Sequence, residues 1–459
     1  GRWDGRGLKI DSSNQTQAQI PLREALAYWL KLGFISFGGP TAQIAMMHDE
    51  LVEKKRWISE RRFLHALNYC MLLPGPEAQQ LATYLGWLMH RTWGGILAGT
   101  LFILPSLIIL IALSWIYIAY GQTPVISALF FGIKSAVTAI VIMAVIRIAK
   151  KSVYNRQLIL VAITSFVAIF AFNLPFPLII LSAGLYGYYL GKHQPILFSK
   201  SSNDHKTTAS NAGSAIIGDH TPLPAHAGFS KIKLIRQLGA ASLLWLIPIF
   251  ILHALFGWGG LYTQLAWFFT KAALLTFGGA YAVLPYVYQS TVEHYQWLSA
   301  AQMMDGLALG ETTPGPLIMI VAFVGFVAAY SQELWIGGSL FLMGALGAVV
   351  ATWFTFLPSF LFILIGAPFI ESTHGNLRFT APLTAISAAV VGVITNLGVF
   401  FAYHLFFPQG PSNSPSLISI AICAIALFLL IRLKWGVISI IGLSGGLGLL
   451  LAPNGLLFS

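Results

Sequence analysis

The residues of this chain most able to do chemistry are charged side chains inside strongly apolar stretches. Lys31 and Lys271 each lie six residues before a Phe-Gly-Gly sequence, in arms that are otherwise apolar. A lysine at bilayer depth costs about 2.5–3.5 kcal/mol on insertion scales, so two lysines at matching positions indicate a role. They could bind a small dianion, which predicts that Lys31→Ala abolishes anion transport. The alternative is that each long side chain extends to the membrane interface.

Three carboxylates, those of Glu77, Asp305 and Glu311, also lie in or beside apolar stretches. Intramembrane carboxylates are often proton carriers, which makes these three candidates for proton coupling. An equal alternative is that they are structural counter-ions for the basic residues. His48 and Arg56 are expected at the cytoplasmic mouth of the pathway, although Arg56 could serve only to orient the chain.

Most of these residues belong to a segment that occurs twice. Lys31, the Phe-Gly-Gly at 37–39 and the Pro-Gly-Pro at 74–76 recur as Lys271, 277–279 and 314–316 at one offset (271 − 31 = 240; 314 − 74 = 240). An ungapped match over about fifty residues that keeps these turns identifies a duplication. In a strongly apolar chain, two halves that break their helices at matching places predict a transporter binding site.

The glycines and prolines predict two helix breaks in each repeat, because together they bar a continuous helix. The half-helices that follow the breaks present free N–H groups and a positive dipole end, which suit an anion. The alternative is that these residues only allow close helix packing, but four breaks in register favour the site. The predicted substrate-binding residues are Lys31, Gly38, Gly39, Thr41, Gln43, Asn68, Pro74, Gly75, Pro76, Glu77, Gln79, Gln80, Lys271, Gly278, Gly279, Pro314, Gly315 and Pro316.

The composition places these elements in a membrane. The 459 residues are 57% hydrophobic and 9% charged, whereas soluble domains carry about 25% charged residues. Apolar runs of roughly 20 residues select helices over a β-barrel. The only two cysteines, Cys70 and Cys423, can form neither a disulfide framework nor a thiolate metal site. We therefore expect no metal and no cofactor.

Charge and motifs exclude two function classes. The net charge is +11, but the basic residues flank apolar runs instead of forming one patch, which argues against nucleic-acid binding. The chain contains no His-Glu-x-x-His zinc motif, no Gly-x-Ser-x-Gly elbow and no P-loop. These absences argue against an enzyme.

The expected fold is an all-α polytopic membrane protein with two inverted-topology repeats. Each repeat should hold two broken or re-entrant helical hairpins plus about four spans, and one extra span should join them. Re-entrant hairpins keep the basic cluster at 54–62 on the cytoplasmic side. The expected segments are a polar tail (1–21), the first repeat (22–191), a cytoplasmic linker (192–237), a connecting helix (238–257) and the second repeat (258–459). The N-terminus is then cytoplasmic and the C-terminus periplasmic.

The segment 37–87, FGGPTAQIAMMHDELVEKKRWISERRFLHALNYCMLLPGPEAQQLATYLGW, resembles the signature of bacterial chromate transporters of the long, two-domain kind. The resemblance covers both repeats, nearly residues 22–451. It implies alternating-access export of chromate, a tetrahedral dianion, across the bacterial inner membrane, driven by the membrane potential and open to proton coupling. The second copy lacks counterparts of Pro40, Glu77, Gln79 and Gln80, so the first repeat should hold most of the substrate.

Two alternatives remain beside chromate export. One is transport of sulfate or another tetrahedral oxyanion, for which chromate is a mimic. The other, from a different class, is an anion channel. The expected partners are the oxyanion and the lipid bilayer, and the sequence leaves a homodimer open.

Overall fold

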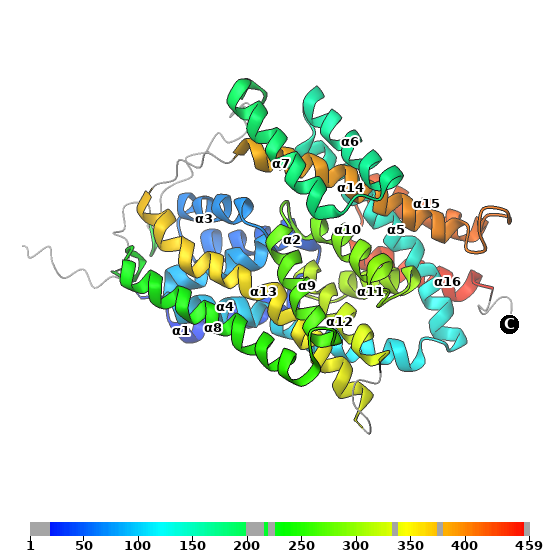
Figure 1. The fold of residues 1–459 in the computed structure, drawn as a ribbon, viewed down its shortest axis with the longest axis horizontal. Helices are drawn as coiled ribbons and strands as arrows, with labels where there is room; N and C mark the ends of the chain where they lie inside the picture. Colours follow the sequence, from blue (N-terminus) through cyan, green and yellow to red (C-terminus); the bar gives the residue numbers. More distant parts are fainter. Residues whose placement is uncertain (1–18, 199–214, 219–224, 333–337, 374–379, 454–459) are drawn as a thin grey trace, which may run out of the picture.

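The computed structural model describes residues 19–198, 215–218, 225–332, 338–373 and 380–453, which form a bundle of helices (Figure 1). Among these residues, strand-like pairing is limited to an isolated bridge between Ile58 and Ile217. The all-helical polytopic fold predicted from the sequence is therefore confirmed. The helices of the first half are α1 (Leu22–Ile35), α2 (Gly39–His48), α3 (Glu60–Leu72), α4 (Glu77–Tyr120), α5 (Pro124–Ser152), α6 (Arg156–Phe172) and α7 (Phe176–His193).

The second half repeats the same order of helices. After α8 (Lys231–Phe256) come α9 (Leu261–Leu275), α10 (Val283–Tyr288), α11 (Ala300–Thr312), α12 (Ile320–Tyr330), α13 (Leu340–Thr373), α14 (Thr380–Phe406), α15 (Leu417–Ile431) and α16 (Val437–Leu451). Helices α9 to α16 therefore correspond to α1 to α7, with the single long α4 matched by the pair α12 and α13.

The helices differ in whether they are long enough to cross a membrane. In the described part of the chain, α4, α5, α8, α13 and α14 are long and apolar enough, whereas α6, α15 and α16 are shorter apolar helices. The helices beside the breaks are also short: α1 has 14 residues and α3 has 13. At 1.5 Å per residue they reach about 20 Å, less than the roughly 30 Å of a hydrocarbon core. These lengths favour re-entrant hairpins over full spans.

Helix α4 contains a sharp turn at residues 90 and 91, whose dihedral angles are not helical. The two pieces pack on each other, because a Cβ atom at Gly86 would lie 2.5 Å from the carbonyl oxygen of Gly94. Likewise, a Cβ atom at Gly99 would lie 2.4 Å from Oγ1 of Thr83. The piece 77–90 therefore folds back along the rest of α4.

The duplication extends to the backbone conformation. Gly38, Gly39 and Gly75 have φ angles of +87°, +79° and +115°, and their equivalents 278, 279 and 315 have +93°, +97° and +112°. Glycine adopts this region without the steric cost of a Cβ atom. Both halves also contain a π-helical turn, at Asp49–Lys54 and at Gln289–His294, which the sequence did not predict. The four breaks lie where the sequence predicted them.

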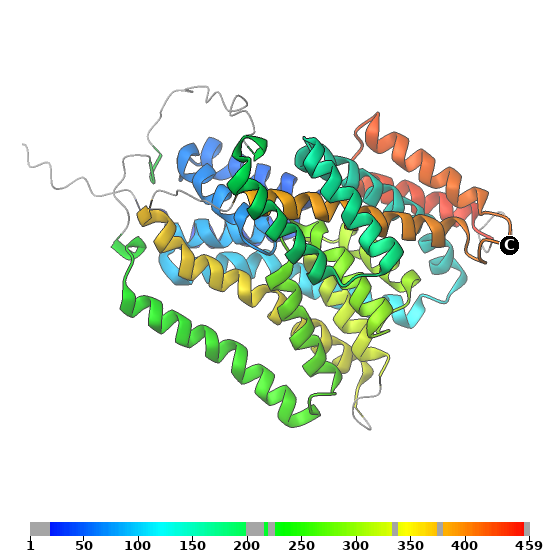
Figure 2. The same cartoon turned by 45° about the horizontal axis from the view of Figure 1, so that its top comes forward.

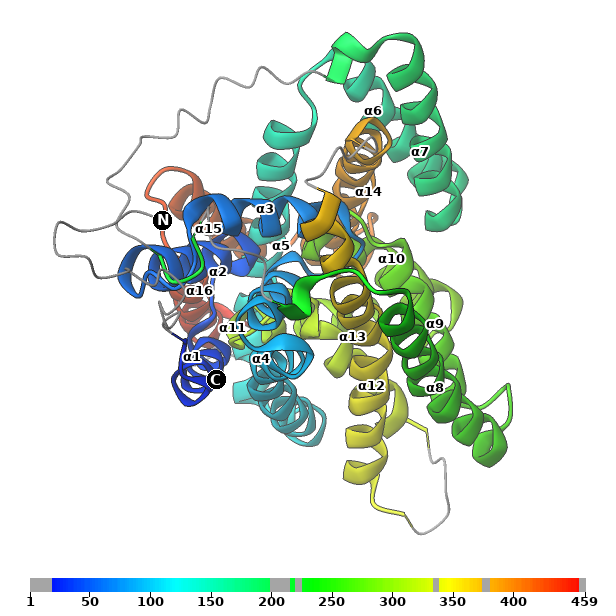
Figure 3. The ribbon, with the colours of Figure 1, turned by 90° about the vertical axis from the view of Figure 1, so that its left-hand side faces the viewer.

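The two halves are intertwined. Helices α15 and α16 of the second half pack on α5 of the first half, and α6 and α7 of the first half pack on α14 of the second. Figure 3 shows α14 beside α6 and α7. The equivalent helices α4 and α13 also pack against each other. Each of these contacts therefore has its equivalent in the other half.

Helix α8 connects the two halves and lies on the outside of the bundle (Figure 2), packing on α9 and α13. It begins at Lys231, seven residues before the connecting helix predicted from the apolar run. Regular structure at the other end extends to Phe198, through a short 3₁₀ turn. The linker is therefore shorter than the predicted 192–237, because basic and polar residues at helix ends mask the true boundaries.

Part of the linker docks on the first half. The N–H of Ile217 donates to the carbonyl oxygen of Trp57 at 2.9 Å, and the N–H of Ser59 donates to that of Ile217 at 2.9 Å. Nε2 of His226 lies 2.9 Å from the carbonyl oxygen of Trp87. The residues 199–214 and 219–224 of the predicted linker lie outside the described part.

Candidate functional site

The four helix breaks meet in the interior through two equivalent hydrogen bonds. The N–H of Gly75 donates to the carbonyl oxygen of Thr276 at 2.8 Å, and the N–H of Gly315 donates to that of Ser36 at 2.8 Å. The pairs are related by the repeat offset (36 + 240 = 276; 75 + 240 = 315). Each Pro-Gly-Pro turn is thus held by the other half's chain just before its Phe-Gly-Gly turn. Both Pro-Gly-Pro turns are buried.

Two serines of the long helices close the space around these turns. A Cβ atom at Gly75 would lie 2.8 Å from Oγ of Ser359, and one at Gly315 would lie 2.8 Å from Cβ of Ser106. These serines end the Leu-Pro-Ser sequences that occur once in each half. The close approach, together with the positive φ angles, explains why glycine occupies both positions.

The buried glutamines at the breaks come from the first half. Nε2 of Gln43 donates to the carbonyl oxygen of Gly315 at 2.8 Å, and Nε2 of Gln80 donates to that of Pro74 at 2.8 Å. Gln79 donates to Oγ1 of Thr83 at 3.2 Å. All three glutamines are buried. At the equivalent positions the second half has Val283, Met319 and Ile320, so the site is chemically one-sided.

The same glutamines leave acceptors unpaired. The side-chain oxygens of Gln43, Gln79 and Gln80 have no hydrogen-bond partner among the described residues. A buried polar group without a partner costs about 1–3 kcal/mol. Three such atoms from one half indicate an interior that accepts a polar guest or water.

The helix starts at the breaks suit an anion. Helices α2 and α4 begin at Gly39 and Glu77 without a side-chain cap. Their N-terminal N–H groups therefore keep the positive end of the helix dipole unblocked by a capping side chain. A Cβ atom at Gly39 would meet nothing within 4 Å. In the second half, short 3₁₀ turns (Ala280–Ala282 and Leu317–Met319) replace these helix starts.

Glu77 reaches across the junction between the halves. Its Oε1 atom lies 3.6 Å from the place where a Cβ atom of Gly279 would be. Glu311, before the second Pro-Gly-Pro, is buried and accepts a hydrogen bond of 2.7 Å from the hydroxyl of Tyr281. The two carboxylates thus lie beside the breaks, whereas Asp305 pairs elsewhere, with Lys134 at 3.5 Å and Tyr117 at 2.5 Å.

The remaining predicted residues lie away from the buried junction or on the surface. Thr41 and Asn68 are exposed, as are Gly38 and Gly278. Lys31 is exposed on a face of α1 that also presents Leu30, Phe34 and Ile35.

Its equivalent, Lys271, lies 5.7 Å from the ring of the exposed Trp267, in a cation–π contact. These positions favour the alternative that the two lysines extend to the membrane interface.

The predicted cytoplasmic mouth is an ion-paired surface. Nε2 of His48 lies 3.5 Å from Glu60, and Arg56 is exposed. The hydrogen bond from Lys54 to Asp49, 2.6 Å long, raises the pKa of this lysine. Ligand atoms of His48, Glu53 and Glu60 lie within 4.8 Å of one another, but pairing and exposed acids explain that group without a metal.

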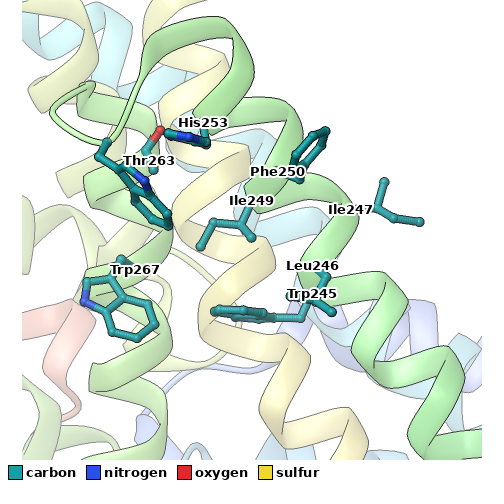
Figure 4. A pocket seen from close by; sticks show the side chains of 9 residues that line it. Trp245, Leu246, Ile247, Ile249, Phe250, His253, Thr263 and Trp267 are labelled. Atoms are coloured by element: carbon teal, nitrogen blue, oxygen red, sulfur yellow. The ribbon is translucent and has the colours of Figure 1, made fainter.

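A cavity beside the connecting helix α8 is not the anion site. It has a volume of about 610 Å³ and lies between α8 and α9, lined mainly by apolar and aromatic side chains such as Trp245 and Trp267. Figure 4 shows Thr263 beside His253 in its wall. Its lining contains no lysine or arginine. The N–H groups at the helix starts are therefore the better binding site for an oxyanion.

Sequence reasoning missed the partners of the buried carboxylates. Tyr117 and Glu371 were not singled out, and the contact of Tyr281 with Glu311 was not foreseen, because these contacts join positions far apart in the chain or have no repeated spacing. Lys134 offered a signal, as a lysine inside an apolar run. Glu371 offered a weaker one, since it ends a long apolar helix.

Comparison with known proteins identifies the family of the chain. The chromate transporter family profile matches residues 23–188 and 263–449, one region in each half. The chain is 33% identical over 433 residues to a chromate transport protein of Pseudomonas aeruginosa, covering 94% of this chain and 92% of the relative. It is 31% identical over 392 residues to a chromate transport protein of Cupriavidus metallidurans, covering 85% of each.

An uncharacterized transporter of Methanocaldococcus jannaschii is 26% identical over 424 residues and is covered to 92%, as is this chain. No solved structure matches the chain.

Proposed function

This chain belongs to the chromate transporter family, a multi-pass membrane family, and we propose that it exports chromate from the bacterial cytoplasm across the inner membrane. The observation that carries the proposal is the pair of equivalent hydrogen bonds, from Gly75 to Thr276 and from Gly315 to Ser36. Each bond joins a Pro-Gly-Pro break to the Phe-Gly-Gly break of the other half. Contacts between α2 and α4, and between the 3₁₀ turns Ala280–Ala282 and Leu317–Met319, join the two pairs. Broken helices at membrane depth persist where they line a protein-covered site.

The proposed substrate site lies at the starts of α2 and α4. The unblocked N–H groups there, near Gly39 and Glu77, would bind the oxygens of a tetrahedral dianion. The side chains of Gln43, Gln79 and Gln80 would orient it from the first half. Lysine side chains are not required by this geometry, since the helix dipoles supply positive potential.

The proposed orientation follows from charge. The basic cluster at 54–62 lies between the two hairpins of the first half, and the equivalent stretch 294–302 contains no Lys or Arg. If positive loops stay inside, the first cluster is cytoplasmic and its counterpart is not. The halves would then be inverted, with the N-terminus cytoplasmic and the C-terminus periplasmic, as in many secondary carriers that work by alternating access.

The membrane potential can drive the proposed direction. One charge crossing 100 mV is worth about 2.3 kcal/mol, so a dianion gains about 4.6 kcal/mol on leaving a negative interior. Export therefore needs no further ion. Glu77 and Glu311, both beside the breaks, are the carboxylates through which protons would couple if they contribute.

Uptake into everted membrane vesicles tests the proposal. Energised vesicles, positive inside, should accumulate chromate, and collapse of the potential should abolish accumulation. Glu77→Gln should abolish uptake in protein that still inserts, whereas Glu53→Gln, an exposed control, should not. Absence of potential-driven accumulation would reject export.

The same vesicles separate the alternatives. Sulfate that competes and is itself accumulated faster than chromate would identify a general oxyanion carrier. Flux far above carrier turnover, without exchange between internal and external chromate, would identify a channel.

A further inference from the structure

Two polar clusters tie the halves together at places away from the helix breaks. The α3–α13 cluster consists of Arg62, Tyr84 and Glu371, and the α11–α4 cluster consists of Tyr117, Lys134 and Asp305. Each joins the first helix of the second hairpin in one half (α3 or α11) to the long helix of the other half (α13 or α4).

The α3–α13 cluster is a buried ion pair with a hydrogen-bonded tyrosine. Nη1 of Arg62 lies 3.2 Å from Oε2 of Glu371, and the side chains are 12% and 5% exposed. The hydroxyl of Tyr84 donates to the other carboxylate oxygen. A second contact between these helices is the 2.9 Å hydrogen bond from Tyr69 to the carbonyl oxygen of Phe362. Both carboxylate oxygens of Glu371 therefore have partners. Removing one partner of a buried ion pair strongly destabilises the contact, because the remaining charge stays buried.

The α11–α4 cluster also consists of a buried carboxylate with a tyrosine hydroxyl and a basic side chain. The hydroxyl of Tyr117, near the end of α4, donates to Oδ2 of Asp305 at 2.5 Å. Nζ of Lys134, on α5, lies 3.5 Å from Oδ1, the distance of an ion pair rather than of a short hydrogen bond. Asp305 is 4% exposed. Opening α11 away from α4 would remove the Tyr117 hydroxyl from this carboxylate and leave Lys134, on α5, as its partner among the described residues.

The clusters occupy equivalent crossings of the repeat. The equivalent of Arg62 is position 302 (62 + 240), one helical turn from Asp305. The equivalent of Glu371 is position 118, by the offset of the Leu-Pro-Ser sequences (357 − 104 = 253; 371 − 253 = 118), next to Tyr117. The two clusters therefore lie at equivalent helix crossings but are built from different residue types.

The two clusters lie on opposite sides of the breaks. Arg62 precedes Pro74 by 12 residues and Asp305 precedes Pro314 by 9, which is about 18 Å and about 14 Å along their helices. Figure 1 shows α3 and one end of α13 toward the left of the view, and α11 and the cyan end of α4 toward the right. These two distances add up to about 32 Å, which is close to the roughly 30 Å thickness of a hydrocarbon core.

We propose that the α3–α13 cluster and the α11–α4 cluster are the two gates of the transporter, one at each mouth of the site between the breaks. The inference rests on the alternating access of the proposed function. The α3–α13 cluster includes Arg62, the last of the basic residues 54–62, and is the cytoplasmic gate. The α11–α4 cluster is the outer gate. Both are closed here, as in an occluded state, and transport requires them to open in turn.

The chain carries its own reporter for the cytoplasmic gate. Cys70, on α3, is fully buried in the core that α3 shares with Ile363, Leu364 and Ala367 of α13. Separation of α3 from α13 would expose its thiol. Because Cys423 is the only other cysteine, Cys423→Ser leaves Cys70 as the single target.

The test is the rate at which a membrane-impermeant maleimide labels Cys70 in everted vesicles, whose cytoplasmic face is outward. Glu371→Gln should raise the rate at least about tenfold, because it removes the carboxylate charge that Arg62 faces across the α3–α13 contact. Tyr84→Phe, a milder change that keeps the packing, should raise it several-fold. Glu60→Gln, an exposed control at the start of α3, should not change it. Asp305→Asn should lower the rate or leave it unchanged, since it favours the opposite opening.

Exchanging the two charges of the ion pair tests the pairing itself, because the slow labelling should return only if the two side chains interact. Arg62→Glu combined with Glu371→Arg should restore slow labelling, whereas either change alone should not. The proposal is overturned if Glu371→Gln and Tyr84→Phe leave the rate unchanged, or if Asp305→Asn raises it as much as they do. Gel filtration in detergent shows which variants are folded. Since labelling needs no substrate, this result is separate from whether chromate is the ion carried.

Discussion

At the scale of single residues, the account depends on glycines that allow two chains to meet. Gly75 and Gly315 combine a positive φ angle with a neighbouring serine at contact distance, and each donates its N–H across the junction. A side chain at either position would strain the backbone and separate the halves where the site is proposed. The glutamines beside them supply polarity from the first half alone.

Gly315→Ala should therefore disrupt the junction. The added Cβ atom would lie 2.8 Å from Cβ of Ser106 at a φ angle of +112°, and such overpacking costs about 1–3 kcal/mol before backbone strain is added. We expect a lowered thermal midpoint in detergent and loss of vesicle uptake. Gly446→Ala, where a Cβ atom meets nothing within 4 Å, is the control and should behave as the unmodified protein.

Lys31→Ala gives the opposite expectation to that drawn from the sequence. Because its side chain is exposed among apolar residues, we expect uptake to stay within about twofold of the unmodified rate, as for an interfacial lysine. Initial rates in everted vesicles, normalised to inserted protein, measure this. A loss as complete as that of Glu77→Gln would return Lys31 to the substrate site.

At the scale of elements, the docked linker is the feature with a defined response to pH. His226 lies against Trp87, and burial, with nearby Arg91, Lys233 and His90, lowers its pKa below the usual 6.5. The docked form therefore favours the neutral ring. This contribution is fully present above about pH 6.5 and is lost as the pH falls through the lowered value.

Hydrogen exchange over residues 225–230 should detect this change. We expect faster exchange, relative to the intrinsic rate, at pH 5.5 than at pH 7.5. In His226→Gln, which cannot be protonated, the two pH values should give the same protection. Equal pH dependence in both proteins would show that another group is responsible.

The helix breaks were readable from the sequence. The Pro-Gly-Pro and Phe-Gly-Gly turns placed all four where the structure has them. The π-helical turns were not readable, because no residue type marks them. The start of α8 was hidden by Lys231, Lys233 and Arg236, which look like linker residues but occupy its first turns.

The site was readable only in its repeated part. Spacing located the breaks and the glutamines beside them. It could not show that Asp305 pairs with Tyr117, 188 residues away, or that Arg62 pairs with Glu371, 309 residues away. Nor could spacing decide which way Lys31 and Lys271 point, since that depends on which face of each short helix packs on its neighbours.

At the scale of the whole molecule, the intertwined halves explain how one site can be shared. Because α5 packs on α15 and α16 while α14 packs on α6 and α7, neither half can form its core alone. A movement of one hairpin pair is therefore coupled to the long helix of the other half. The direction of the second half in the membrane remains a prediction from charge.

Single cysteines at equivalent positions would establish that direction. Arg56 and Gln296 are exposed and have φ angles of +50° and +55°, so Arg56→Cys and Gln296→Cys report on matching loops. In a background without Cys70 and Cys423, an impermeant thiol reagent should label position 56 only from the cytoplasmic side and position 296 only from the outside. Labelling of both from one side would mean that the halves are parallel.

The claim on which the account depends is that the four breaks form one binding site for an oxyanion. Anomalous X-ray diffraction at the chromium edge, from crystals soaked in chromate, would locate the ion directly. The account predicts a single strong peak within contact distance of the N-terminal N–H groups of α2 and α4, beside Gly39 and Glu77. A peak at Lys31 or in the cavity beside α8, with none at the breaks, would contradict it.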